Sequence, residues 1–163
     1  MYIKVENDCQ VECLTHLAKE IWTNHFGRMI ARETLEAIIE TVQSKEAVVK
    51  QMNDGLLYYL IPGKRSPVGY FGYSLSVLKD ELFLSKLYIL ATERRKGLGR
   101  QVLRHLETVC RDNALSTIRL TVYPKNTSAI ESYKKLGFHI AGTIHRDLGN
   151  GIAFDDIVMQ KAI

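Results

Sequence analysis

The sequence has few cysteines and no CxxC pair, which argues against a disulfide framework. Cys9, Cys13 and Cys110 are an odd number of thiols in a chain of 163 residues. A zinc site shared by Cys9, Cys13 and His16 is disfavoured as well, because a structural zinc site takes four ligands and no fourth one lies nearby. We expect the cysteines to be small apolar side chains, and we expect no metal.

Long hydrophobic runs are also missing. No run approaches the roughly 18 apolar residues that cross a bilayer. The N-terminal segment MYIKVENDCQ becomes polar at its fourth residue, which argues against a secretory signal. Hydrophobic residues make up 46% and charged residues 25%, as in ordinary globular proteins. We therefore expect a cytoplasmic protein with no membrane partner.

A strong charge of one sign is absent too. The 22 Lys and Arg residues against 18 Asp and Glu leave a formal net charge of +4. A nucleic-acid binder of this size more often carries a larger excess along one face. The basic residues gather only around Arg94 to Arg104, so we expect no nucleic-acid partner and interpret the charge as local.

The first half of the chain predicts helices followed by a sheet. A short strand at residues 2–5 precedes three helical stretches with apolar residues at helical spacing, at about residues 9–26, 32–43 and 45–54. Asp8 and Ser44 are the expected N-caps of the first and third. The pattern then changes to β-branched and aromatic residues with a period of two, which predicts three antiparallel strands at residues 56–62, 67–78 and 81–90.

The second half alternates strand and helix. A helix is expected at about residues 98–113, a strand at 117–124, a short helix at 126–138 stopped by Gly137, and a closing strand pair at 139–148 and 154–163. No repeat or linker interrupts the chain. We expect a single α/β domain over residues 1–163, with a mixed sheet whose strands on either side of the helix at 98–113 are parallel.

The stretch ERRKGLGRQVLRHLE, residues 93–107, places four cations and two glycines directly before that helix. The unbonded N–H groups of the first helical turn and the positive end of the helix dipole favour an anion. Gly97 and Gly99 allow a phosphate oxygen to approach the backbone. A solvated basic turn is the alternative.

Two known phosphate-binding loops do not fit. A dinucleotide fingerprint needs a third glycine where Val102 stands. A P-loop needs Ser or Thr after its Gly-Lys pair, but Gly63 and Lys64 are followed by Arg65. The hexapeptide RRKGLG instead fits the pattern [Q/R]xxGx[G/A].

With that pattern, the segments SKLYILATERRKGLGRQVLRHL and NTSAIESYKKLGF resemble the acetyl-CoA-binding half of the GNAT superfamily of N-acetyltransferases. The resemblance covers residues 82–138. It implies a mixed, mostly antiparallel sheet flanked by helices, with a splayed parallel strand pair. The closing segment GNGIAFDDIVM further resembles bacterial spermidine/spermine acetyltransferases.

The resemblance implies roles for individual residues. The main chain of Leu87, Tyr88 and Ile89 would pair with pantetheine, or is plain sheet core. Asn126 would hydrogen-bond the pantetheine arm, and Tyr133 would protonate the leaving thiolate unless it is only an aromatic core residue. The coenzyme A pyrophosphate would bind the backbone N–H groups of the glycine turn, beside an Arg94 side chain that supports the loop: Arg95, Lys96, Gly97, Leu98, Gly99 and Arg100.

The implied reaction is direct attack of a neutral amine on acetyl-CoA in a ternary complex, and an acyl-cysteine route is disfavoured. We expect a small amine such as a polyamine as acceptor, and a homodimer. A protein lysine or N-terminal amine, or a non-catalytic coenzyme A sensor, remain alternatives. The general base stays open among Asp80, Glu81, His139, His145, Asp155 and Asp156. The aromatic segment at Trp22, His25 and Phe26 either walls an acceptor pocket or belongs to the core.

Overall fold

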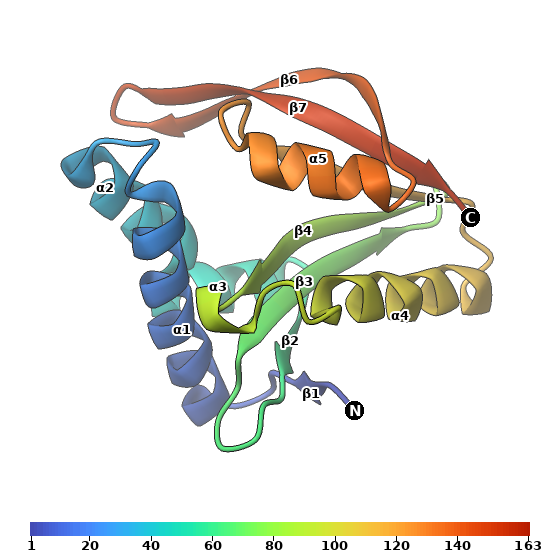
Figure 1. Ribbon diagram of the computed structural model, residues 1–163, viewed down its shortest axis with the longest axis horizontal. Coiled ribbons are helices and arrows are strands. Elements are labelled where there is room, and N and C mark those ends of the chain that lie inside the picture. Colours follow the sequence, from blue (N-terminus) through green and yellow to red (C-terminus); the bar gives the residue numbers. More distant parts are fainter. The chain divides into compact units, whose positions relative to one another are not determined.

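A computed structural model describes all 163 residues (Figure 1). The chain forms two compact units, one of residues Met1–Tyr73 and Lys86–Leu98, the other of residues Ser74–Ser85 and Gly99–Ile163. Every expected element is present in the expected order: β1 (Ile3–Lys4), α1 (Asp8–Phe26), α2 (Arg32–Gln43), α3 (Lys45–Asn53), β2 (Leu57–Ile61), β3 (Gly69–Ser76), β4 (Glu81–Ile89), the 3-10 turn η1 (Ala91–Glu93), α4 (Leu98–Asp112), β5 (Thr117–Val122), α5 (Thr127–Lys135), β6 (His139–Gly149) and β7 (Ile152–Ala162).

The N-cap of α1 differs from the expected one. Asn7, not Asp8, adopts the extended conformation before the helix, and its side chain accepts a hydrogen bond from Gln10 N at 3.0 Å. The Gln10 side chain accepts one in return from Asn7 N, which completes a capping box. Asp8 lies in the first turn, where its charge favours the helix dipole. The expected cap at Ser44 is confirmed by its bond from Ala47 N.

In the first unit, α1, α2 and α3 are joined to the sheet by a buried polar network. Trp22 Nε1 donates to the Tyr70 hydroxyl at 2.8 Å, and Tyr70 donates to Gln43 Oε1 at 2.6 Å. Gln43 Nε2 donates to the Tyr58 hydroxyl, which donates to Gln51 Oε1. Because buried polar groups need partners, this network fixes how the three helices meet β2 and β3.

The strands of the first unit follow the order β1-β2-β3-β4, and β2 pairs antiparallel with both β1 and β3. Side chains alternate between the faces. Tyr58 and Tyr70 belong to the polar network, whereas Tyr59, Phe71 and Tyr73 stack on the other face with ring centroids 5.2 to 6.3 Å apart. This alternation is the reason that the aromatic-rich run is recognisable as strand in the sequence.

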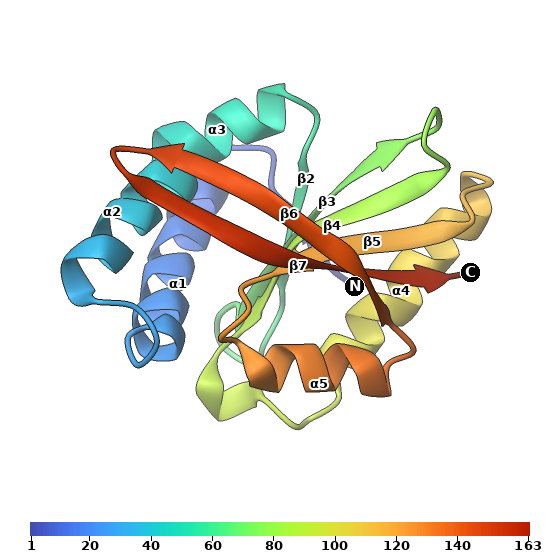
Figure 2. The same ribbon diagram turned by 90° about the horizontal axis from the view of Figure 1, so that it is seen from above.

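The second unit contains the parallel pair. Glu81 to Leu84 of β4 pair with Thr117 to Leu120 of β5, and the ladder ends before either strand does. β7 pairs antiparallel with β5 and β6, and β6 and β7 form a long hairpin (Figure 2). Helix α4 buries Val102, Leu103, Leu106 and Cys110. The expected α/β class with one parallel pair is confirmed. None of the helices is both long and apolar enough to cross a membrane.

Candidate functional site

The turn between β4 and α4 exposes a row of backbone donors. Arg95 and Gly97 have φ angles of 63° and 82°, in the left-handed region. None of the N–H groups from Arg95 to Arg100 donates to another group of the protein. A Cβ at Gly97 would meet nothing within 4 Å, so the space above this residue is open. Consecutive free donors next to open space at a helix start fit a phosphate group.

The cationic side chains of this turn do different things. Lys96 forms an ion pair with Glu93 at 3.0 Å. Arg94 is an exposed residue whose guanidinium is held in place: its Nε donates to Ile89 O at 3.0 Å, and its NH1 group lies 3.3 Å from His25 Nδ1. Burial lowers the pKa of Arg94. The first position of the glycine motif therefore braces the turn, and the side chains of Arg95 and Arg100 remain exposed.

His25, at the last turn of α1, is the partner that holds Arg94 and was not singled out for this role from the sequence. A guanidinium has only donors, so Nδ1 of His25 accepts and its Nε2 carries the proton. No motif marks the residue, because the contact joins positions 69 apart in the chain. His25 ties the last turn of α1 to the glycine turn.

Replacing His25 tests this brace. His25→Leu is expected to raise KM for acetyl-CoA about fivefold with kcat nearly unchanged, because about 1 kcal/mol of hydrogen bonding to Arg94 is lost. His25→Asn places an amide oxygen near the position of Nδ1 and should restore KM. Steady-state kinetics of the two variants decide the matter. Equal KM values for both would mean that the hydrogen bond to Arg94 does not position the turn.

The end of β4 is held on several sides. Ile89 O accepts from Arg94, and Leu90 N donates to Val68 O at 2.9 Å, so both polar groups of the Ile89–Leu90 peptide are fixed. A Cβ at Gly69 would lie 2.5 Å from Tyr88 O, which only glycine avoids. The backbone at Leu87, Tyr88 and Ile89, expected to pair with pantetheine, is thus placed by neighbouring β3 and by Arg94.

The aromatic segment at the end of α1 belongs to the packed interior of the first unit. Trp22 and Phe26 are buried, and their rings lie 5.0 and 6.2 Å from that of Tyr88. Tyr88 also packs against Tyr70 at 5.6 Å. The sequence left open whether this segment walls an acceptor pocket or belongs to the core. Trp22 and Phe26 are core residues, and His25 contacts Arg94.

In the second unit, Asn126 immediately precedes α5 and is 6% exposed. Its Oδ1 accepts a hydrogen bond of 3.4 Å from Ser128. Tyr133 lies within α5, and its ring meets that of Phe138 edge-on at 5.4 Å. The residue is partly exposed as a whole, but burial raises the pKa of Tyr133 to about 12. Its hydroxyl therefore stays protonated at neutral pH, as a proton donor must.

The structure separates the candidates for general base. The Asp80 carboxylate accepts hydrogen bonds from the backbone N and hydroxyl of Ser116, and these bonds lower the pKa of Asp80. Asp80 thus anchors the β3–β4 turn to the start of β5. His145 and Asp155 form an exposed pair 2.8 Å apart. Asp156 is buried.

The two remaining candidates for general base each lie at the start of a strand. Glu81 begins β4 and is partly exposed, and His139 begins β6 and is exposed. Cys110 is buried, and burial raises the pKa of this thiol to about 11, which opposes a nucleophilic role. No group of three or more His, Cys, Asp or Glu residues is arranged to hold a metal ion.

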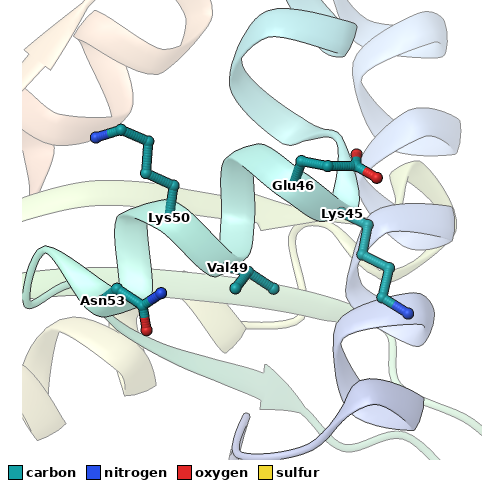
Figure 3. Close-up of a pocket in the computed structure, with 5 residues that line it drawn as sticks. All are labelled: Lys45, Glu46, Val49, Lys50 and Asn53. Atoms are coloured by element: carbon teal, nitrogen blue, oxygen red, sulfur yellow. The ribbon is translucent and has the colours of Figure 1, made fainter.

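A shallow surface groove of about 410 Å³ runs along α3 (Figure 3). It is lined by Lys45, Glu46, Val49, Lys50 and Asn53. All of these belong to one helix, and none is a residue that the sequence places in a site. The groove is a feature of the α3 surface alone.

Comparison with known proteins identifies the family. A sequence profile of the acetyltransferase (GNAT) family matches residues 23–138. The chain belongs to this family. The match contains the glycine turn together with Asn126 and Tyr133, so the resemblance inferred from the sequence is confirmed at the level of the family.

Solved structures agree on the fold. The PaiA N-acetyltransferase of Thermoplasma acidophilum, in complex with coenzyme A, superimposes with a TM-score of 0.80 at 20% identity, covering 100% of this chain and 99% of that one. The Escherichia coli ribosomal-protein-S18-alanine N-acetyltransferase reaches a TM-score of 0.69 at 18% identity, covering 100% and 94%. Similarity at these identities shows the GNAT fold and nothing finer.

Curated relatives match a part of the chain. N-alpha-acetyltransferase 50 of Danio rerio is 40% identical over 86 residues, which is 52% of this chain and 51% of the relative. The [ribosomal protein bS18]-alanine N-acetyltransferase of Escherichia coli (strain K12) is 37% identical over 71 residues, 44% and 47% of the two chains. The chain thus spans about half the length of the curated relatives it matches.

Proposed function

We propose that the protein is an acetyl-CoA-dependent N-acetyltransferase acting as a single domain over residues 1–163. The observation that carries the proposal is the row of N–H groups from Arg95 to Arg100, none of which has a partner in the protein, beside the open space at Gly97. Buried or clustered donors left without partners call for an acceptor, and the pyrophosphate of coenzyme A supplies several oxygens. Membership of the GNAT family supports the same cosubstrate.

The other cofactor contacts that we propose are those implied by the family resemblance, on β4 and directly before α5. Leu87, Tyr88 and Ile89 offer main-chain groups to the pantetheine arm in the manner of an added strand. Asn126 contributes its side-chain amide to the same arm. Arg94 supports the turn from behind through Ile89 O and His25.

The chemistry that we propose is direct transfer. A neutral amine attacks the thioester carbonyl, and a main-chain N–H near Ile89 stabilises the oxyanion. The C–S bond then breaks, and the thiolate takes a proton from Tyr133. The proton that the nitrogen loses as the amide forms returns to the Tyr133 phenolate, directly or through water. The raised pKa of Tyr133 supports this role, because the hydroxyl is protonated when the thiolate forms.

For the acceptor we propose a small cationic amine such as a polyamine, because β7 of the β6–β7 hairpin carries a buried carboxylate, Asp156. A protein N-terminal amine is the second candidate. It is favoured by the names of two curated relatives, which describe an N-alpha-acetyltransferase and a ribosomal-protein alanine N-acetyltransferase.

A thiol-release assay tests the function. Acetyl-CoA is incubated with the protein and either spermidine or a peptide with a free N-terminal alanine, and the melting temperature is measured with and without acetyl-CoA. We expect coenzyme A release that depends on the amine, and a higher melting temperature with acetyl-CoA. A stabilised protein that turns over neither amine would retain the cosubstrate site and remove both acceptors. An unchanged melting temperature and no turnover would overturn the proposal.

A further inference from the structure

The β6–β7 hairpin carries two acid–base pairs on its two faces. His145 and Asp155 are directly opposite each other in the strand register, with His145 Nδ1 2.8 Å from Asp155 Oδ1 and side chains 65% and 77% exposed. The next residue, Asp156, points to the other face, as alternation requires. Its side chain is 6% exposed, and Arg146 Nε lies 3.1 Å from its Oδ2.

The buried pair is incompletely satisfied. Arg146 Nε is itself buried and donates no hydrogen bond, so the 3.1 Å approach to Asp156 lacks the alignment of a hydrogen bond. Burial raises the pKa of Asp156, and this effect is larger than the lowering of the pKa by the nearby charge of Arg146. Buried carboxylates are normally hydrogen-bonded, because removing the charge from water is costly. Asp156 therefore has room for a donor that the protein does not supply.

Asp156 lies beside the end of β5, at an edge of the sheet where ligands can bind. The β5–β7 ladder ends with Val122 opposite Ile157, so Asp156 lies at the carboxyl end of β5, from which the chain proceeds to Asn126. Ligands of open α/β sheets bind outside the carboxyl ends of the parallel strands. Lys161, five residues further along β7, bonds Glu107 of α4 at 2.6 Å. By alternation, Asp156 faces away from α4.

We propose that Asp156 is the carboxylate that receives the acceptor amine in its ammonium form, before the attacking nitrogen gives up a proton to water and becomes neutral. A primary ammonium has three N–H donors on a compact charge, which is what the buried carboxylate lacks. Asp155 does not serve in this role, because it is exposed and already paired with His145. The inference rests on the proposed acetyl transfer to a primary amine.

Steady-state kinetics of four proteins test the assignment: wild type, Asp156→Asn, Arg146→Gln and Asp155→Asn, each with spermidine and with a peptide bearing an N-terminal alanine. Asp156→Asn is expected to raise KM for the accepted amine about tenfold or more while KM for acetyl-CoA stays unchanged, because a charge-assisted hydrogen bond is lost. Arg146→Gln should leave or lower the amine KM, since it frees the carboxylate. Asp155→Asn, on the same strand, should behave as the wild type.

Comparing Asp156→Asn with Arg146→Gln distinguishes a role in amine binding from a purely structural role of the ion pair. If the pair only stabilises the hairpin, Asp156→Asn and Arg146→Gln lower the melting temperature alike and leave the amine KM unchanged, which overturns the inference. If Asp156→Asn does not fold, Asp156→Glu is measured in its place. An unchanged KM for the amine in Asp156→Glu, together with a raised KM for the amine in Arg146→Gln, would also overturn the inference. Wild-type protein that turns over neither amine removes the proposed acceptors and this inference together, whereas turnover insensitive to Asp156 removes the inference alone.

Discussion

Tyr133→Phe is expected to lower kcat for acetyl transfer about a hundredfold while KM for acetyl-CoA changes little. The substitution removes the hydroxyl and keeps the ring that meets Phe138 edge-on, so the packing of α5 should persist. Without a proton donor, the coenzyme A thiolate is a poorer leaving group, and breaking of the C–S bond slows. Thiol release under saturating acetyl-CoA and amine measures the effect.

The pKa of Tyr133, raised to about 12 by burial, adds a second signature. An acid loses activity as pH rises through its pKa, so the wild type should keep the Tyr133-dependent rate across the neutral range and beyond the ordinary tyrosine value of about 10. Tyr59→Phe is the matched control, because it removes a hydroxyl from the stacked face of the first unit. Equal kcat values for Tyr133→Phe and Tyr59→Phe would refute the acid role.

Gly97→Ala should raise KM for acetyl-CoA about thirtyfold. Gly97 has φ +82°, where an L side chain is strained by about 1 to 2 kcal/mol. Its Cβ would point into open space, where we propose that the pyrophosphate binds. A methyl group there opposes binding in addition to the strain. The effect should fall mainly on KM, with a smaller change in kcat.

Gly55 provides the control for strain alone. It has φ +103°, and a Cβ added to it would meet nothing within 4 Å, but it lies in the turn between α3 and β2. Gly55→Ala should lower the melting temperature to a similar extent and leave both kinetic constants near wild type. A Gly97→Ala protein whose KM matches that of Gly55→Ala would place the pyrophosphate elsewhere.

The elements and the glycine turn could be predicted because their causes are local. Apolar residues at helical or alternating spacing define α1 to α5 and the strands, and the free donors before α4 follow from the helix start itself. The one expected cap that was wrong also has a local cause. Asp8 was expected to cap α1, but Asn7 caps it and forms a capping box with Gln10.

The contacts that place the turn could not be predicted in the same way. His25 meets Arg94 across 69 positions, and Gly69 meets Tyr88 because two strands approach each other closely. Neither contact has a pattern of its own in the sequence. They depend on where the folded chain brings α1, β3 and β4 together, which is set by packing and by the buried network around Tyr70.

The pair Asp155 and Asp156 shows most clearly where sequence reasoning ends. The amino-acid order was enough to predict the family, the succession of helices and strands, the glycine turn before α4, and the rule that one of two adjacent strand residues faces away from the other. Which carboxylate is buried beside Arg146 and which is exposed beside His145 became known only from the folded chain. Alternation is a property of the strand itself, whereas burial depends on what the rest of the chain packs against each face.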